Sequence, residues 1–525
     1  MNIRKIGITA SVVTLLAVAI GFGVKMKFES DVRADVEKFL AALPQPMKAN
    51  AEKIVVSFFD KSVILTNITF SYPIPLSTGD KEETLPLTFS AARVTAEGIN
   101  MDGFAPGAGV AKLVDRLAIE KLVIDTSLTK LQIDQYNDHN ISANFSLVIS
   151  EFRKNIPLLI ESGNISSEKT VNDETTQKAM RAIADILKAA ETIHVGASSY
   201  TNYTYTMDVE GTKVDMLVQR GDSKDYSIRG GKSFAMNGLT VSVNGTKVAT
   251  LDSSTIDEVI LPSFIPLFEV LADDPMPHKI QSALKGQPFT INNLQMKNMR
   301  VNHPILQDRT MFALGNMNLS YVTEDAHTMN FAFNNMSFDK NMIAEAAELP
   351  AEVLALLPDT ITFDGLIDQT VAIREGNIFD LDCQKIFFKG TGLGEATIAL
   401  AVDNISPMAY ALGVPNPAKL RLFDAKVSDQ GFTNIFFAME AHHNDISAEE
   451  NRANEIESLR SQIDNEPGQP GREILEGLAK FLELPGGSLQ IMVKPEQAVT
   501  VEQLMQAYAQ NPTSLGVSVT FTPAK

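Results

Sequence analysis

The chain has 525 residues, which at about 150 residues per domain allows three or four domains, or two large ones. Its 44% hydrophobic and 21% charged residues are typical of a globular protein and exclude global disorder. The 64 Asp and Glu against 45 Lys and Arg give a net charge of −19, which disfavours nucleic acid as a partner because its phosphates would be repelled. The single cysteine, Cys383, excludes an intrachain disulfide and any zinc or iron–sulfur cluster held by cysteines.

An uncharged apolar segment at residues 6–24 predicts an N-terminal membrane anchor within residues 1–27. As a helix this segment would be about 28 Å long, close to the thickness of a bilayer core. The alternative is a signal peptide cleaved at the small residues Ala17-Val18-Ala19, but the apolar run continues beyond that point and favours the anchor. The side chains expected to contact the membrane are Ile6, Ile8, Val12, Val13, Leu15, Leu16, Val18, Ile20, Phe22 and Val24.

Basic residues flank this segment on both sides, so their count does not decide its orientation. Large domains translocate largely regardless of charge, so we expect the N-terminus in the cytoplasm and the body outside. In a Gram-negative cell the protein would then cross the inner membrane once and carry its body in the periplasm.

The pattern after the anchor predicts a stalk helix within residues 28–52 and then a β-rich region at 53–428. Alternating β-branched and aromatic residues punctuated by Asp, Asn, Gly and Pro are typical of antiparallel strands. We therefore expect a mainly β, α+β fold with one or more large curved antiparallel sheets, in which 53–250 and 286–428 form two related halves. The expected strands lie at 54–59, 63–70, 89–99, 117–131, 141–152, 193–219, 233–251, 289–301, 312–323, 327–338, 360–373, 378–388, 394–403 and 419–427.

A short phrase recurs within these strands: an apolar residue, one or two spacers, an Asn or Gly, and then an apolar-x-apolar triplet. Asn and Gly tolerate a positive φ, so the phrase predicts a bulge or bend after which the strand resumes with its apolar side inward. The Asn or Gly positions of the copies are Asn67, Gly98, Gly238, Asn293, Asn316, Asn335 and Gly365.

Helices are expected at 172–191, in pieces within 263–284, and at 341–357 with a break at Pro350. Residues 429–525 predict a C-terminal α+β segment. Its helices are expected at 429–443, from a capping box at Ser447 to about residue 462, at 472–484 and at 500–510, and its strands at 488–493 and 515–522.

Three local features are weighed as sites of chemistry, and none predicts a catalytic, cofactor or metal site. His442 and His443 are adjacent, so they point to different sides of a helix and do not chelate as an i, i+4 pair would. Cys383 lies in an expected strand with no histidine close in sequence, which favours a buried structural thiol. The glycine-rich run at 390–394 joins two strands instead of opening a helix, so it favours a hairpin over a phosphate loop.

The remaining signal is a large number of apolar strands, with 28 Phe and 20 Met. These residues would form an ordinary two-layer core, or one face of a curved sheet would line a groove for lipid acyl chains, to which Met and Phe adapt.

The sequence resembles the YdgA-like and AsmA-like proteins of the Gram-negative envelope. The resemblance rests on the anchor at 6–24, the phrase at 58–70, the later Asn/Gly-Leu strands and the ending at 431–495. It implies a single N-terminal membrane helix, a long periplasmic β-rich region and, for the AsmA-like group, a part in phospholipid transport and outer-membrane integrity.

We therefore expect a non-enzymatic inner-membrane protein that shields or transfers acyl chains or maintains the envelope, with phospholipid as its ligand. The alternative is a scaffold without a lipid ligand, which binds another envelope protein through a sheet edge or the C-terminal helices. A hydrolase is disfavoured because no catalytic motif is present.

Overall fold

The computed structural model describes residues 48–525 apart from short gaps, and it divides into two compact units, residues 1–289 and 290–525. The gaps are 58, 79–80, 106, 127, 164–173, 210, 274–275, 277–278, 281–282, 284–288, 304–308, 324–325, 348, 375–377, 407–416, 445, 467, 511 and 525. The expected anchor at 6–24 and most of the stalk lie outside the described residues. Within the described part of the chain, no helix is both long and apolar enough to cross a bilayer.

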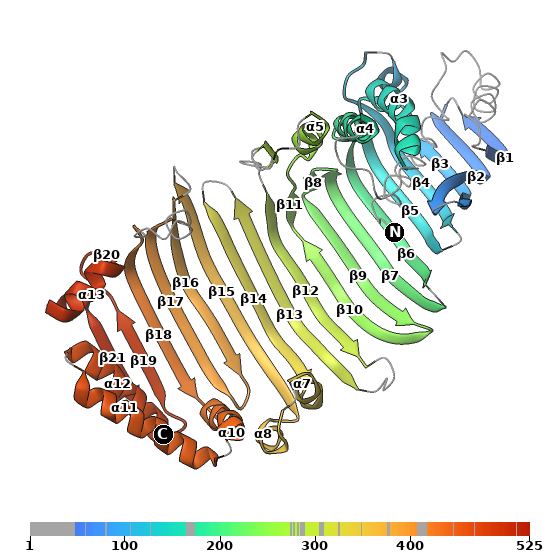
Figure 1. Cartoon of the computed structure of the whole chain (residues 1–525). Helices are drawn as coiled ribbons and strands as arrows, with labels where there is room; N and C mark the ends of the chain where they lie inside the picture. Colours follow the sequence, from blue (N-terminus) through green and yellow to red (C-terminus); the bar gives the residue numbers. More distant parts are fainter. Residues whose placement is uncertain are drawn as a thin grey trace. The chain divides into compact units, whose positions relative to one another are not determined.

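The first unit is built on an antiparallel meander (Figure 1). Each strand from β1 to β7 pairs with the next one along the chain, and β9 pairs with β7 and with β10. The short strands β8 and β11 pair with each other beside β7. The strands are β1 (Lys48–Ser57), β2 (Ser62–Thr78), β3 (Lys81–Glu97), β4 (Ala111–Asp125), β5 (Thr129–Ala143), β6 (His194–Val209), β7 (Thr212–Ser227), β8 (Gly230–Gly231), β9 (Ser233–Val243), β10 (Thr246–Ile256) and β11 (Glu258–Ile260).

Helices close one side of this first sheet. Those that contribute to its core are η1 (Met101–Phe104), α3 (Phe145–Gly163) and α4 (Glu174–Ala190), and α5 (Ile265–Asp273) packs against α4. Val148 of α3 and Ala189 of α4 join one continuous core with strand residues such as Leu65, Leu117 and Ile119, all at most 2% exposed. Dense burial of aliphatic side chains is the main force that stabilises such a unit.

The second unit is also an antiparallel meander, in which each strand from β12 to β19 pairs with the next and β21 follows β19. Its strands are β12 (Thr290–Asn302), β13 (Thr310–Thr323), β14 (His327–Asp339), β15 (Thr360–Arg374), β16 (Ile378–Gly390), β17 (Gly394–Ile405), β18 (Lys419–Asp429), β19 (Ser488–Val493), β20 (Val499–Thr500) and β21 (Val517–Thr522). Its helices are α7 (Lys340–Ala347), α8 (Ala351–Leu356), α10 (Phe432–Asn444), α11 (Ala448–Asn465), α12 (Gln469–Glu483), α13 (Val501–Gln510) and η3 (Pro512–Leu515).

The expected mainly β fold with helical insertions is confirmed at this level. The helix break at Pro350 separates α7 from α8, and the Ser447 side chain accepts a hydrogen bond from the Glu450 amide (3.1 Å), as the capping box predicts. The sequence places a domain boundary near residue 428, at the end of β18. In the structure, α10 to α12 follow β18, and β19 then pairs with β18 in the same sheet.

The strand expected at 141–152 is wrong, because β5 ends at Ala143 and α3 begins at Phe145. The Asn144 side chain accepts a hydrogen bond from the Leu147 amide (3.1 Å), which caps the helix and ends the strand. The ranges 117–131, 193–219 and 233–251 were each expected as one strand, but each contains a turn between two strands.

The recurring Asn/Gly phrase marks left-handed residues inside strands at five of its seven positions. φ is positive at Asn67, Gly98, Gly238, Asn293 and Asn335. The expectation is wrong at Asn316 and Gly365, which do not have a positive φ. The ladder shifts register next to Asn293 and Asn335 but continues unshifted past Asn67, so not every copy is a bulge.

Candidate functional site

Left-handed residues keep apolar side chains on one side of the second unit's sheet. On β12 the apolar positions change from Leu294 and Met296 to Met299 and Val301, a shift in alternation at Asn298, whose φ is 53°. A regular strand would turn Met299 to the opposite face. The alternation of apolar residues changes at the same level on β13, between Leu314 and Met317, and on β14, between Phe333 and Met336. The apolar residues of the three strands therefore continue to face one another across the ladder.

At the same level of the sheet, the close approach of a neighbouring strand explains why residue 315 is a glycine. This glycine on β13 lies between Asn298 of β12 and Asn335 of β14 in the two ladders. A Cβ on Gly315 would lie 3.0 Å from the Cβ of Asn335 and 3.1 Å from the Asn334 carbonyl oxygen. Glycine at this position therefore lets the left-handed Asn335 of β14 lie close beside β13.

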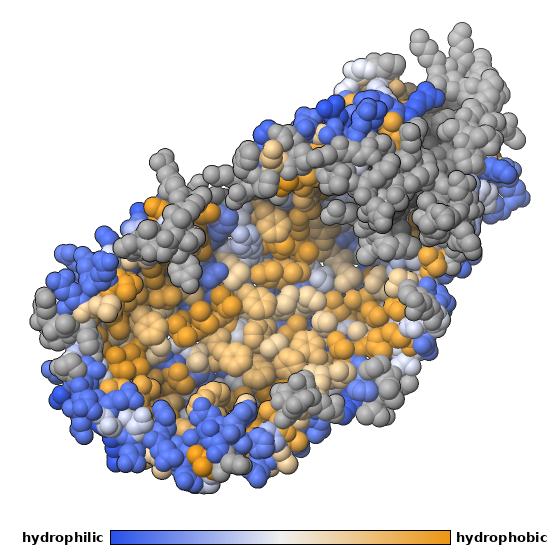
Figure 2. Space-filling model, viewed as in Figure 1, coloured by the Kyte–Doolittle hydropathy of each residue, from blue (hydrophilic) through white to orange (hydrophobic). Residues whose placement is uncertain are grey.

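The result is a face of β12–β18 with almost no polar side chain, which we call the apolar face. Residues directly opposite in an antiparallel ladder project to the same side, and this relation connects its members. They are Leu294, Met296, Met299, Phe312, Leu314, Met317, Leu319, Phe331, Phe333, Met336, Phe338, Phe363, Ile367, Cys383, Ile386, Phe388, Ile398, Leu400 and Phe423. Figure 2 shows hydrophobic residues gathered over these strands, with hydrophilic residues along the helices beside them.

An aromatic row crosses four strands of the apolar face. Ring centroids are 5.3 Å apart for Phe312 and Phe338, 6.0 Å for Phe338 and Phe363, and 5.0 Å for Phe363 and Phe388. These separations are in the range in which aromatic pairs attract beyond simple burial. The row stiffens the face across the strands and presents a continuous hydrocarbon surface.

Most of the apolar face stays partly accessible to solvent. Of its residues only Leu314 and Cys383 are buried, whereas Ile386 is 37% and Phe388 is 42% exposed. Among the described residues, the compact core of this unit is a small cluster of Val353, Leu357, Ile361 and Ile435 at one end of the sheet. The apolar face is therefore not the interior of a closed two-layer core.

The described helices cover only the margins of this face. At its β19 end, α12 lies close over the sheet, since a Cβ on Gly477 would be 2.5 Å from Val519 and 3.1 Å from Leu489. Leu489 pairs with Val427 and so shares the side of the apolar face, but it is only 5% exposed. α12 thus buries the apolar side chains of β19, which lie next to the apolar face. The apolar face itself opens from β18 towards β12.

The opposite side of the same strands is polar and carries the charges. Arg421 bonds to Asp403 through Nε at 2.8 Å and to Asp382 through Nη2 at 3.4 Å, joining β16, β17 and β18. Lys385 lies 5.1 Å from the ring centroid of Phe387, next in sequence to Phe388 but on the other face. The opposite side thus carries the charged side chains, although it also includes apolar residues such as Phe387 and its ladder partner Leu366.

The first unit contains a buried polar cluster that sequence analysis missed. Asp138 is 4% exposed, and it accepts hydrogen bonds from Tyr136 (3.0 Å) and Tyr226 (3.4 Å). Burial raises the pKa of Asp138 above its usual range, and burial together with the nearby carboxylate raises the pKa of Tyr226 to about 12. Both hydroxyls therefore stay protonated and donate to the carboxyl at neutral pH. The expected strands ended at 131 and resumed at 141, so sequence analysis placed Asp138 outside any strand, and only the fold shows that Tyr226 of β7 reaches across β6 to this residue of β5.

The three sequence features weighed for chemistry give no reactive site. Cys383 lies on β16 of the apolar face at 3% exposure, and burial raises the pKa of its thiol, which disfavours the nucleophilic thiolate. Gly390 and Gly394 pair directly at the turn between β16 and β17, as expected for a hairpin. His442 and His443 end α10, and the described part of the chain contains no cluster of metal-ligating side chains.

Comparison with known proteins adds one finding. A family model described as "Uncharacterized protein" matches residues 387–522, which span the end of β16 to β21. The chain has no significant match among curated proteins or among solved structures.

Proposed function

We propose that the second unit holds lipid acyl chains against the apolar face, so that the protein shields or transfers lipid in the cell envelope. The observation that supports this proposal is a sheet face made of Phe, Met and aliphatic residues that stays partly open to solvent. Monomeric proteins seldom expose such contiguous surfaces unless they bind something there.

The chemistry of the face suits a hydrocarbon chain better than a polypeptide. Its backbone N–H and C=O groups are already used in the ladders, and its side chains offer almost no hydrogen-bonding groups. A peptide laid on it would leave its own backbone groups unpaired, at a cost in free energy. An acyl chain has no such groups, and Met317, Met336 and their neighbours can adapt to its shape.

The width of the apolar face also suits an acyl chain. Seven strands at about 4.8 Å spacing make a face about 29 Å wide, whereas an acyl chain of one leaflet spans about 15 Å, half of a bilayer core. Covering a patch of about 300 Å² would contribute about 7 kcal/mol. This is enough for stable but reversible retention of a lipid.

The cellular setting remains part of the proposal. The apolar segment at 6–24 would anchor the chain in the inner membrane with its body in the periplasm, as in the YdgA-like and AsmA-like proteins that the sequence resembles. Both units are antiparallel meanders with left-handed Asn residues in their strands, which supports an origin from two related halves.

The test is the lipid content of the gently extracted full chain, measured by mass spectrometry. We expect co-purifying phospholipid in the natural sequence, a severalfold loss in Phe388→Glu and no loss in Phe387→Glu. These two neighbours lie on opposite faces of one strand, so the second variant is a matched control. Lipid-free natural protein, or equal lipid in the two variants, would contradict the proposal.

A second function is favoured by a different surface, the outer side of α10. Phe432, Phe436 and Met439 follow at helical spacing and are 55%, 43% and 39% exposed, while Ile435 and Phe437 of the same helix are buried. Such a stripe would suit binding of another envelope protein by a scaffold. A photo-crosslinking residue at Met439 should then capture one defined partner in cells, and capture only of lipid or of nothing would remove this second function.

A further inference from the structure

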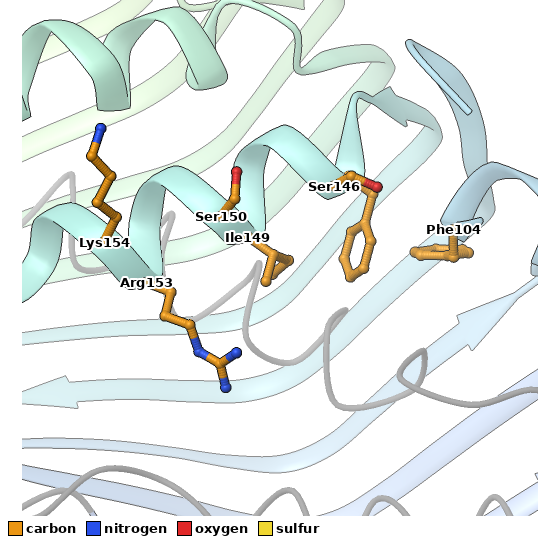
Figure 3. A pocket seen from close by; sticks show the side chains of 7 residues that line it. Phe104, Ser146, Ile149, Ser150, Arg153 and Lys154 are labelled. Carbon is orange, nitrogen blue, oxygen red and sulfur yellow. The ribbon is translucent and has the colours of Figure 1, made fainter. Parts of the chain in front are cut away.

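A cleft of about 490 Å³ in the first unit lies between η1 and α3. Figure 3 shows its lining side chains, which come from the end of η1 and from the first three turns of α3. The volume is in the range of pockets that bind small ligands. This cleft involves neither the apolar face nor the Asp138 cluster.

The wall of the cleft is aromatic at one end. The rings of Phe104 and Phe145 meet edge to face with centroids 4.7 Å apart. Phe145, Ile149 and Arg153 follow at intervals of four residues, so they share one stripe of α3. The neighbouring stripe, with Val148 and Asn155, is buried in the unit. The helix therefore presents an apolar surface to the cleft that ends in a cation.

Arg153 makes no hydrogen bond or ion pair with any described residue. Lys154, next to it, points to the opposite side of α3 in Figure 3 and bonds to Asp185 at 3.0 Å and Glu151 at 3.5 Å. Other arginines also have carboxylate partners, for example Arg116 with Glu97 and Arg309 with Asp339. In a chain with a net charge of −19, an arginine without a carboxylate beside an aromatic cleft is available for an external anion.

From this arrangement we infer that the cleft binds an anionic lipid, with its acyl chain against Phe104, Phe145 and Ile149 and its phosphate at the Arg153 guanidinium. This inference rests on the proposed lipid function and adds a preference for a negatively charged head group. Guanidinium binds phosphate through paired hydrogen bonds, and an apolar wall adds affinity only when a chain is attached. A free phosphate would make only the hydrogen bonds to the guanidinium and would gain nothing from the apolar wall.

The chain contains no tryptophan, so a single tryptophan reports on one site. In the full-length Phe145→Trp chain, short-chain phosphatidylglycerol with brominated acyl chains should quench the fluorescence in a saturable manner. Phosphatidylcholine with the same chains should bind more weakly, and inorganic phosphate at equal concentration should not displace the lipid. Adding Arg153→Gln should weaken phosphatidylglycerol binding about tenfold, the effect of one charged hydrogen-bonding pair.

The matched control is Arg181→Gln on α4 of the same chain, which removes the same charge from an arginine that does not line the cleft and should leave the affinity unchanged. Arg153→Lys should retain part of the affinity, which separates charge from guanidinium geometry. Equal affinity for the two lipids together with no effect of Arg153→Gln would overturn the inference, as would displacement of the lipid by phosphate alone.

A second reporter separates this inference from the proposed function. If the brominated lipid quenches a Phe388→Trp chain but not the Phe145→Trp chain, the cleft inference is overturned and the apolar-face proposal stands. If it quenches only the Phe145→Trp chain, the cleft binds lipid and the apolar-face proposal is contradicted.

Discussion

Gly365 on β15 lies opposite Phe333 on β14, and a Cβ on Gly365 would be 2.3 Å from the Phe333 ring. The ring therefore occupies the space above the glycine in the middle of the apolar face. On the next strand Phe388 is also paired with Gly365. Absence of a side chain at this one position therefore leaves room for the Phe333 ring within the apolar face.

Gly365→Ala is accordingly expected to displace the Phe333 ring and to lower the free energy of unfolding by about 1 kcal/mol. The cost stays small because the ring is at the surface and can move outward. The double variant Gly365→Ala with Phe333→Leu should recover part of this loss, measured by thermal denaturation. A loss of equal size with and without Phe333 would show that the ring contact is not its cause.

Asp138 predicts a pH dependence of the first unit's stability. Its pKa is raised in the folded state, so the unfolded state loses its proton first as the pH rises. The contribution of this group is complete below its ordinary pKa and is lost as the pH rises through the folded pKa. Asp138→Asn removes that loss, so its stability relative to the natural chain should increase between about pH 4 and about pH 7. Denaturant unfolding at both pH values measures the change, and a constant difference would contradict it.

The opposite dependence is expected from Asp339 in the second unit. Arg309 donates from Nε to its Oδ2 (3.0 Å) and from Nη2 to its Oδ1 (2.5 Å), and the Asn341 and Met342 amides also donate to it. The Arg309 contact lowers the Asp339 pKa to about 2. Its stabilisation is therefore present above the ordinary carboxyl pKa and is lost as the pH falls towards about 2.

Asp339→Asn should remove the ion pair with Arg309, at a cost of about 2 kcal/mol at neutral pH, whereas the asparagine amide oxygen can still cap α7. The cost should shrink on acidification, which urea unfolding at low pH can measure. A cost that is the same at neutral and acidic pH would show that the charge of Asp339 does not contribute.

The N-terminal segment predicts the compartment of the chain's C-terminus. A reporter that is active only in the periplasm, fused after Lys525, should be active if the apolar segment at 6–24 anchors the body outside the cytoplasm. Deleting residues 1–27 should abolish that activity while the reporter is still made. An active cytoplasmic reporter at the same position would contradict both the periplasmic location and the family resemblance.

Local rules predicted most strands of the second unit and five left-handed residues, because both depend on neighbouring side chains, but they missed other left-handed residues such as Asn298. Alternation predicts β12 to β18, and Asn335 tolerates its positive φ through its own short polar side chain. The start of α3 was misread because Phe145, Leu147 and Ile149 alternate as in a strand, although Phe145, Val148 and Phe152 also have helical spacing. The cap at Asn144, which decides between the two patterns, was missed.

The openness of the apolar face was not predictable from sequence. Phe and Met alternate in the same way whether a second layer covers them or not, so a closed core and a ligand face share one pattern. Tertiary packing distinguishes them: α3 and α4 close the core of the first unit, whereas α12 lies over β19 and β21 at the edge of the second. Arg153 was likewise missed, because the anion site proposed there depends on the lack of a carboxylate partner among the described residues.

The central claim is most directly tested with two single-tryptophan chains, Phe388→Trp and Phe387→Trp, exposed to phospholipid with brominated acyl chains. Bromine quenches only within short range, so we expect strong quenching for Phe388→Trp on the apolar face and little for Phe387→Trp on the opposite face. Equal quenching of the two, or no quenching of Phe388→Trp, would contradict the claim that this face holds acyl chains.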